Sequence, residues 1–403
     1  MTSDVANLLP FFSRASRALT VIAILTTLAL LSACSIGPGR YAGGLGKPVA
    51  WNDIKGWADD NQAEAWPALV QSCSRLENSD PTWRELCLEA RLIESPDNET
   101  ARAFFETRFV ARPLIAKSGS SEGLITGYYE PLLQGSRKRT DVFRYAVYGR
   151  PADLLVIDLG DLYEDLRGKR VRGRLKGDRR VVPYFSREEI DNGKNPLKGN
   201  EIAWVADPVG LFFLHIQGSG RIRFQNGSEL AVGYSDQNGH PYFAIGRRLI
   251  ENGDIPEEKV SMQTIREWLR NNPDEAVDLL NSNPSYVFFA KRDKDKHGPV
   301  GSLGVTLTPE RSIAVDRRVV RLGLPVWLDT TLPNSEEKIP YRRLVFAQDT
   351  GGAISGTVRA DLFWGNGLRA EENAGRMRQP GSLFVLVPAQ SKPVSLGESR
   401  PET

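Results

Sequence analysis

The sequence is poor in the side chains that usually hold metal ions. Its 403 residues include only three histidines and three cysteines, and His215, His240 and His297 are scattered along the chain. No group of cysteines and histidines has the spacing of a metal site. The sequence therefore predicts no bound metal, and nothing in it calls for a cofactor.

A strong charge of one sign is also lacking. The 52 Lys and Arg residues oppose 50 Asp and Glu residues, so the formal net charge is +2. Nucleic acid binding needs a basic surface, and this balance argues against nucleic acid as the main partner. One basic run, RGKRVRGRLKGDRR at 167–180, departs from the balance. It fits a solvated β-hairpin or loop, or a surface attracted to an anionic polymer or a membrane.

The apolar run at about 18–31 is too short for a comfortable membrane span. It follows Arg14 and Arg17, as the apolar part of a secretory signal peptide does. It ends in Leu-Ser-Ala-Cys, which resembles a bacterial lipobox. This predicts a signal peptide at 1–33 and diacylation of Cys34, which anchors the chain to a membrane. An ordinary signal peptide with a chance cysteine is the alternative.

The residues after the predicted lipidation site indicate the membrane to which the protein is sorted and a flexible tether. Ser35, in place of an aspartate, is typical of an outer-membrane lipoprotein that faces the periplasm. Residues 34–48 are rich in glycine and predict a flexible tether. At the other end, the polar residues 391–403 predict a disordered tail.

Residues 51–109 have the spacing of helices. Apolar residues recur three and four positions apart in three runs, the second starting at Asp80-Pro81 and the third capped by Asn98. Cys73 and Cys87 fall in the first two runs. In an oxidising periplasm they could form a disulfide, and two buried thiols on neighbouring helices are the alternative.

From about Gly123 the pattern changes to short β-like runs separated by Gly, Pro, Asn and Asp. One stretch of such runs is IAWVADPVGLFFLHIQGSGRIRFQNGSELAVGY at 202–234. Helical patterns return at 241–283, and β-like runs resume from 285. This frequency of turns indicates β-barrels rather than a parallel sheet with crossover helices.

A glycine-rich segment, FAQDTGGAISGTVRADLFWGNG at 346–367, holds the carboxylates of Asp349 and Asp361. Asp349-Thr350-Gly351 spells the tripeptide of aspartic proteases. Such a protease needs two aspartates, each in its own D-[ST]-G turn, and the chain has no second copy. A purely structural role is the alternative. In that case the glycines occupy barrel corners with positive φ, and the aspartates cap backbone amides.

Three clusters suggest a sugar ligand. They are TGYYEP at 126–131, HIQGSGRI at 215–222 and DLFWGNG at 361–367. Aromatic faces stack on pyranose rings, while amides, hydroxyls and carboxylates bind ring hydroxyls, and glycines allow a close approach. Each cluster alone is weak evidence for a sugar ligand, because buried tyrosines are usually part of a hydrophobic core.

Several long motifs in the same order resemble the membrane-bound lytic murein transglycosylase A family. The resemblance covers about 123–387 and rests on GYYEPLLQGS, YAVYGRPADLL, ADPVGLFFLHIQGSGRI, GYSDQNGHPYFAIGR, NPSYVFFAKR, GSLGVTLTPERSIAVD and AQDTGGAISGTVRADLFWGNG. The last motif belongs to the family's 3D domain, named for three aspartates. These correspond here to Asp316, Asp349 and Asp361.

The resemblance implies a mainly β fold with N-terminal helices. A double-psi β-barrel domain would comprise 49–135 and 240–390, with the 3D domain at about 310–388. A smaller β-barrel domain would be inserted at 136–239. The glycan strand would lie in a groove between the two domains.

The resemblance also implies an activity. The family cleaves the β-1,4 bond between N-acetylmuramic acid and N-acetylglucosamine in peptidoglycan and leaves 1,6-anhydromuramic ends, so no water is consumed. A hydrolase needs two carboxyls. When the C6 hydroxyl of the sugar is the nucleophile, one carboxyl can act first as acid and then as base. The family assigns this role to Asp361, whose pKa must be raised, and Phe363, Trp364 and Asp349 could supply that.

The other expected roles follow from the same resemblance. Asp349 would support the acid or the oxocarbenium-like charge, or would only hold its turn. The residues expected to bind substrate are Tyr128, Tyr129, Glu130, Gln217, Ser219, Asp316 and Trp364. One departure is Leu368-Arg369, where many relatives have an acidic residue.

The implied partners are peptidoglycan strands and the outer membrane, through the lipid anchor. Complexes that synthesise the cell wall are a further possible partner. The alternative function is a non-catalytic lipoprotein that binds peptidoglycan.

Overall fold

The computed structural model describes residues 43–78, 81–167, 169, 171–192, 195–292, 298–333 and 337–389, all of which belong to one compact unit. The predicted signal peptide, Cys34 and the predicted tail lie outside the described residues. Among the described helices, none combines the length and apolar character that crossing a membrane requires.

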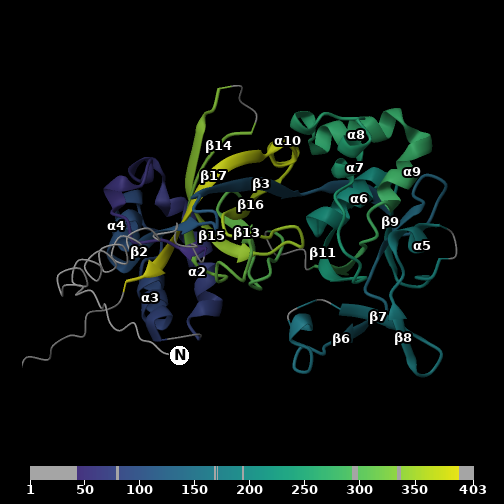
Figure 1. The fold of residues 1–403 in the computed structure, drawn as a ribbon, viewed down its shortest axis with the longest axis horizontal. Helices are drawn as coiled ribbons and strands as arrows, with labels where there is room; N and C mark the ends of the chain where they lie inside the picture. Colours follow the sequence, from purple (N-terminus) through teal and green to yellow (C-terminus); the bar gives the residue numbers. More distant parts are fainter. Residues whose placement is uncertain are drawn as a thin grey trace, which may run out of the picture. The chain divides into compact units, whose positions relative to one another are not determined.

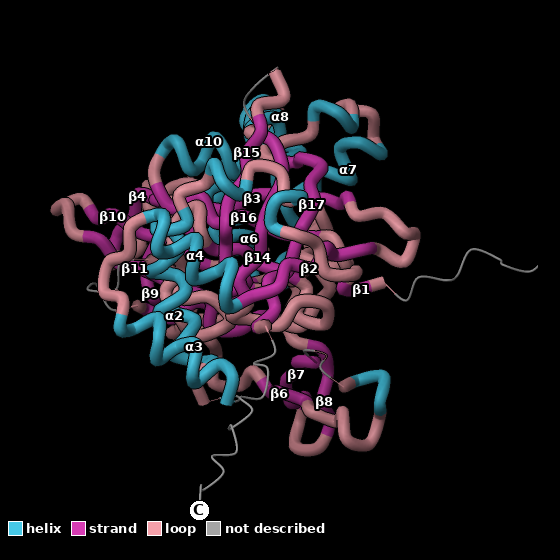
Figure 2. Tube along the Cα trace, turned by 90° about the vertical axis from the view of Figure 1, so that its left-hand side faces the viewer, coloured by secondary structure: helices cyan, strands magenta, loops and turns pink. Residues whose placement is uncertain are grey.

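Three helices lie between the short strand β1 (Gly44–Leu45) and the other strands, as the three- and four-residue spacing predicts. They are α2 (Trp66–Leu76), α3 (Pro81–Leu92) and α4 (Asn98–Arg108). Their buried faces pack on one another and on Trp327 and Phe346 of the neighbouring sheet. Figure 2 labels the three helices. A disulfide joins Cys73 of α2 to Cys87 of α3, which is the first of the two alternatives.

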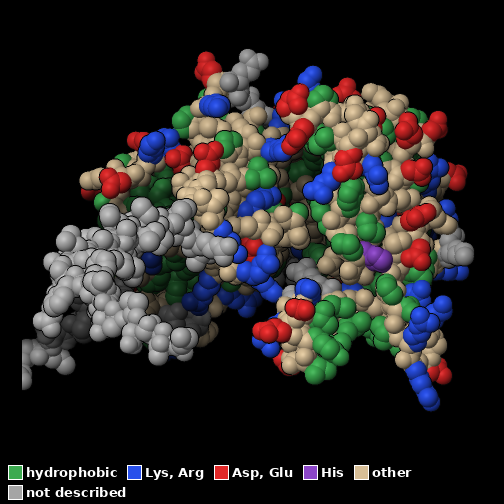
Figure 3. All heavy atoms as spheres, viewed as in Figure 1, with side chains coloured by type: hydrophobic (Ala, Val, Ile, Leu, Met, Phe, Trp, Pro, Cys, Tyr) green, Lys and Arg blue, Asp and Glu red, His purple; other side chains and the backbone are tan. Residues whose placement is uncertain are grey.

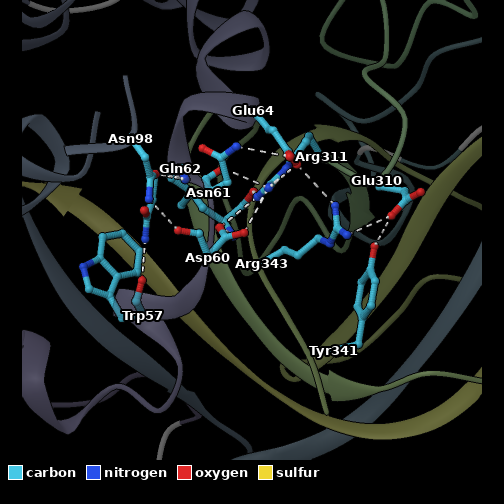
Figure 4. Close-up of polar contacts among 11 residues, drawn as sticks. Trp57, Asp60, Asn61, Gln62, Glu64, Asn98, Glu310, Arg311, Tyr341 and Arg343 are labelled. Carbon is cyan, nitrogen blue, oxygen red and sulfur yellow. Dashed lines mark hydrogen bonds and ion pairs between the residues drawn. The ribbon is translucent and has the colours of Figure 1, made fainter. Parts of the chain in front are cut away.

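The prediction that Asn98 caps α4 is wrong. The cap is Asp97, whose Oδ1 accepts a hydrogen bond of 2.8 Å from the Thr100 N–H. The Asn98 side chain instead reaches the preceding loop (Figure 4), where it accepts from the Gln62 N–H at 2.6 Å and donates to the Asp60 carbonyl at 3.0 Å. The cap proposed for α3, Asp80, lies outside the described residues.

Eight strands form the first sheet. They are β1 (Gly44–Leu45), β2 (Phe109–Ile115), β3 (Glu122–Glu130), β13 (Ser312–Val315), β14 (Pro325–Thr331), β15 (Pro340–Asp349), β16 (Arg359–Asn366) and β17 (Arg378–Pro388). Their order is β1-β2-β17-β14-β15-β13-β16-β3, and β17 also pairs with β3. The extra pairing closes six of the strands into a ring around an apolar core that includes Ile125, Ile313 and Leu362.

Six strands form the second sheet. They are β4 (Leu132–Ser136), β5 (Tyr145–Tyr148), β9 (Glu201–Val205), β10 (Ser219–Phe224), β11 (Glu229–Gln237) and β12 (Val287–Lys291), in the order β12-β11-β10-β4-β9-β5. A bridge between Gly149, just after β5, and Phe289 of β12 brings the two edges together. The mainly β class with N-terminal helices is thus confirmed. The double-psi connectivity and the domain boundaries stay predictions.

A small third sheet contains the basic run. It comprises β6 (Leu155–Ile157), β7 (Val171–Lys176) and β8 (Arg180–Pro183). β7 and β8 pair antiparallel, so residues 171–183, which include the last ten residues of the run, form a β-hairpin. Arg172 donates to Asp236 of β11 at 2.9 Å, whereas Lys176 and Arg180 are exposed, and Figure 3 shows basic side chains at the hairpin tip on the lower right.

Six more helices complete the described fold. They are α5 (Arg187–Asp191), α6 (Pro208–Gln217), α7 (Ile245–Glu251), α8 (Met262–Asn271), α9 (Pro273–Asn281) and α10 (Leu368–Arg376). Helices α7 to α9 fall in the predicted helical stretch (Figure 1). The β-like interpretation of 208–217 is wrong. Because this run is apolar on all sides, it has no visible period, while Asp207 as cap and Pro208 at the first turn start the helix α6.

A buried ion pair ties the N-terminal segment to the first sheet (Figure 4). Arg311 donates to both carboxylate oxygens of Asp60, at 2.8 and 2.9 Å, and both side chains are almost fully buried. The same Asp60 carboxylate accepts from the Leu344 N–H of β15 at 2.9 Å. The contact fixes the position of the helices against the strand that ends in Asp349.

Candidate active site

Asp349 and Asp361 are brought to two sides of one strand. Asp349 ends β15 and Asp361 lies in β16, and both are in register with Ala314 of β13, which runs between them. Neighbouring strands are about 4.8 Å apart, so the two backbones are about 10 Å apart. Residues in register across a sheet point to the same face, which directs both carboxylates to one side of the ring.

A pocket of about 500 Å³ lies over these carboxylates. Its first wall includes Tyr128, Ala314, Asp349 and Asp361 of the first sheet. Its second wall comes from α6, β10, β11 and the segments beside them, and includes Gln217, Ser219, Tyr234, Tyr242 and Arg292. The site is therefore built from both sheets, as the predicted groove requires.

Asp361 is half-buried and has one hydrogen-bond partner among the described residues. The Thr126 hydroxyl, in register on β3, donates to its Oδ1 at 2.5 Å. Burial raises the pKa of the Asp361 carboxyl above its ordinary value. The Thr126 hydrogen bond and the Arg359 charge act against this rise, while the Asp349 charge adds to it. A raised pKa is what a carboxylic acid needs to hold a proton near neutral pH.

Asp349 has a different environment. Its Oδ1 accepts from the Ser302 N–H at 2.8 Å, from the Ser302 hydroxyl at 2.9 Å and from the Thr350 N–H at 2.8 Å. Its Oδ2 accepts from the Tyr128 hydroxyl at 3.0 Å. Burial raises the pKa of Asp349, and these four hydrogen bonds oppose the rise. Asp349 thus binds backbone amides, as the turn interpretation expects, and also faces the pocket.

Three of the predicted substrate-binding residues line the pocket. Tyr128 lies over Phe363, with ring centres 5.2 Å apart. Gln217 ends α6, and its Oε1 accepts from the Tyr129 N–H at 2.9 Å, which links the two walls. Ser219 starts β10 beside it.

Four predicted residues do not line the pocket. Tyr129 is buried and its hydroxyl accepts from Arg266 at 3.3 Å. Glu130 is buried between Arg221 and Arg292. Trp364 packs on Tyr341 in the core of the ring, and its indole N–H contacts the Met377 sulfur. Asp316, the fourth, lies beside the glycine-rich turn.

Asp316 holds the glycine-rich turn. Arg318 donates to both of its carboxylate oxygens, at 2.9 and 2.7 Å, and the Gly356 N–H donates at 3.0 Å. The Arg318 hydrogen bond holds the pKa of Asp316 well below its usual range. Gly356 has a φ of +124°, so this turn needs glycine. Among the three aspartates of the motif, Asp316 is the one with a purely structural set of contacts.

Several residues that line the pocket or hold its carboxylates were missed at the sequence level. Tyr234 and Tyr242 are 43% and 42% exposed, and both line the second wall. Ser302 holds Asp349, and Thr126 holds Asp361. A strand period would have found Thr126, because it lies two residues before Tyr128 and shares its face.

Comparisons with known proteins agree with this architecture. The family model of the MltA specific insert domain matches residues 124–290, and that of the 3D domain matches 311–387. Membrane-bound lytic murein transglycosylase A of Vibrio cholerae is 30% identical over 276 residues, which cover 66% of this chain and 67% of that protein.

Solved structures extend the match to most of the chain. A membrane-bound lytic murein transglycosylase from Agrobacterium tumefaciens is 34% identical with a TM-score of 0.75, covering 86% of this chain and 98% of that one. E. coli MltA with bound chitohexaose is 27% identical with a TM-score of 0.66, covering 87% and 96%.

Proposed function

The chain belongs to the membrane-bound lytic murein transglycosylase A family, and from this membership we propose that it cleaves peptidoglycan glycan strands. The bond cleaved is the β-1,4 bond between N-acetylmuramic acid and N-acetylglucosamine, and the product carries a 1,6-anhydromuramic end. The observation that carries the proposal is the pair of unlike carboxylates, Asp361 and Asp349, on one wall of the pocket between the two sheets.

Asp361 is the acid and then the base. Its protonated carboxyl gives a proton to the glycosidic oxygen as the bond from that oxygen to C1 of the muramic acid breaks. The C6 hydroxyl then attacks C1 and returns its proton to the Asp361 carboxylate. The acid is restored and no water is consumed, so a second catalytic carboxyl is not needed, in contrast to a hydrolase.

Asp349 supports this reaction as an anion. Its four hydrogen-bond donors favour the ionised form, which stabilises positive charge that develops on the sugar ring. Its negative charge also favours the proton on Asp361.

The second wall supplies the contacts that a glycan needs. Tyr234 and Tyr242 present exposed rings for the faces of pyranose rings, while Gln217 and Ser219 are placed to bind hydroxyls or acetamido groups. The chitohexaose bound by the E. coli relative is an N-acetylglucosamine oligomer, which supports the same class of ligand here.

The proposal places the protein at a membrane. The relatives are named membrane-bound. We further propose that Cys34 is lipidated and anchors the protein to the outer membrane, facing the periplasm, where peptidoglycan lies. The predicted tether 34–48 is too long, because Gly44 and Leu45 pair with β2 as strand β1, so we propose that only the residues before Gly44 act as the tether.

Digestion of purified sacculi tests the activity. Mass spectrometry of the released muropeptides should show anhydro ends, and Asp361→Asn should lower turnover by about 10²–10⁴-fold with glycan binding kept. Products 18 Da heavier, with reducing ends, would show a hydrolase instead. Equal product profiles from the wild type and the variant, with binding intact, would favour the non-catalytic lipoprotein.

A further inference from the structure

The two carboxylates of the pocket differ most in how they are held. Asp349 is fixed by four donors. Among the described residues, Asp361 accepts only one side-chain hydrogen bond, from the Thr126 hydroxyl to Oδ1 at 2.5 Å. Thr126 and Asp361 are also in register on the paired strands β3 and β16, so the backbone fixes the distance over which this contact forms.

We propose that Thr126 is the positioning residue of the acid, and that it selects Oδ2 of Asp361 as the oxygen that transfers the proton. This inference rests on the proposed function. With Oδ1 engaged by Thr126, Oδ2 has no described partner and Asp361 lines the pocket. In the first step the proton on Oδ2 moves to the glycosidic oxygen as the C1–O bond breaks. In the second step the C6 hydroxyl forms the new bond to C1 and its proton returns to Oδ2.

The hydrogen bond from Thr126 also limits the rise of the Asp361 pKa. Four groups face this carboxyl or lie beside it: Thr126 and Tyr128 on β3, Asp349 on β15, and Arg359 on its own strand. Burial and the Asp349 charge favour the neutral acid, whereas Thr126 and Arg359 favour the carboxylate. Thr126 therefore offsets part of the rise in the Asp361 pKa that burial causes.

Thr126→Val tests the proposal, because it removes the hydroxyl at similar volume. Activity depends on a protonated Asp361, so it falls as pH rises through the pKa of that group. Loss of a bond to the carboxylate raises this pKa, and the alkaline limb of the kcat profile should move up by about one pH unit. We expect kcat at neutral pH to fall about tenfold or more with KM nearly unchanged, since only the acid is misplaced. Thr126→Ser, which keeps the hydroxyl, should restore both values.

Thr330→Val is the matched control. Thr330 is a buried threonine of the same sheet whose hydroxyl donates to the Pro380 carbonyl at 2.7 Å, away from the two carboxylates. It should lower thermal stability much as Thr126→Val does and leave the pH profile in place. An alkaline limb that stays put or moves down in Thr126→Val, or that moves equally in Thr330→Val, would overturn the proposal.

The failure of this inference is distinguishable from failure of the proposed function. If the wild type makes anhydro products and Asp361→Asn loses them, the function stands whatever Thr126 does. If the wild type makes none, the function itself fails before the Thr126 variants are compared.

Discussion

Asp349 and Asp361 carry the same carboxyl group but meet different neighbours. Four donors surround Asp349, while Asp361 has a single hydroxyl partner and lies next to another negative charge. Environments that separate two like groups assign them different tasks. The residue types alone could not have made this assignment, because Thr126 and Ser302 come from segments far away in the sequence.

Tyr242 gives a test of the second wall at this scale. Tyr242→Ala should raise KM for glycan strands roughly fivefold, because an aromatic contact is worth about 1 kcal/mol, and should leave kcat nearly unchanged. Steady-state kinetics on sacculi or on glycan oligomers measures both. Tyr242→Phe keeps the ring and is the control. A drop in kcat alone, or an equal effect of Phe, would contradict a stacking role.

The sequence located only part of the site, because successive side chains of a strand point to opposite faces of the sheet and only one face lines the pocket. Tyr128 reaches the pocket, whereas Tyr129, the next residue, points to the other side and is buried. The same holds at Asp361 and Trp364, where the tryptophan enters the core beside Tyr341. A composition-based argument treats such neighbours alike, whereas the period of two separates them.

At the scale of elements, the contact between Asp60 and Arg311 sets how the N-terminal helices meet the first sheet. Asp60→Ala leaves Arg311, whose side chain is 3% exposed, with the more exposed Glu64 as its only charge partner among the described residues. Breaking a buried pair in this way should cost about 3–5 kcal/mol in the free energy of unfolding. Denaturant unfolding of the full chain measures it.

Glu257→Ala is the control for that measurement. Glu257 pairs with Arg378 at 3.2 Å, but both side chains are more than half exposed. Solvent screens such a pair, so its loss should change stability far less. If the two variants were equally stable, burial would not be what makes the Asp60 contact matter.

The helices show which elements a period can reveal. Helices α2 and α8 are amphipathic, with one buried face, and their spacing predicted them. Helix α6 is buried on almost all sides, so its apolar residues left no period, and only Asp207-Pro208 marked its start. A helix of this kind is predicted better from the capping residue and the proline of its first turn than from the pattern of its apolar residues.

At the scale of the whole molecule, Glu130 joins the two sheets. It ends β3 of the first sheet, and its fully buried carboxylate pairs with Arg221 of β10 and with Arg292, which follows β12 of the second sheet. One side chain thus holds three segments at the point where the chain passes from one sheet to the other. Its buried carboxylate was taken for a substrate contact because sequence gives no view of this junction.

Glu130→Gln should therefore destabilise the protein. The change leaves two guanidinium groups without their shared anion, at a cost of about 3 kcal/mol or more in the free energy of unfolding. Glu229→Gln, at a more exposed pair with Arg223, should cost less than about 1 kcal/mol. Thermal or denaturant unfolding compares the two. Equal stabilities would show that Glu130 does not hold the junction.

The closure of the first sheet was the feature least accessible to sequence. Strand runs could be marked along the chain, but the pairings of β17 with β2 and β3 join segments more than 250 residues apart. Nothing local specifies such partners. The frequency of turns indicated β-barrels, but no local pattern specified which strands pair to close the ring.

β17 is also the last of the ring's strands to leave the ribosome. Until it arrives, β3 and β14 are left without the neighbour that completes the ring, and the wall that carries Asp349 and Asp361 is not supported on all sides. The order of strands along the chain thereby delays assembly of the pocket wall until the last of these strands has been synthesised.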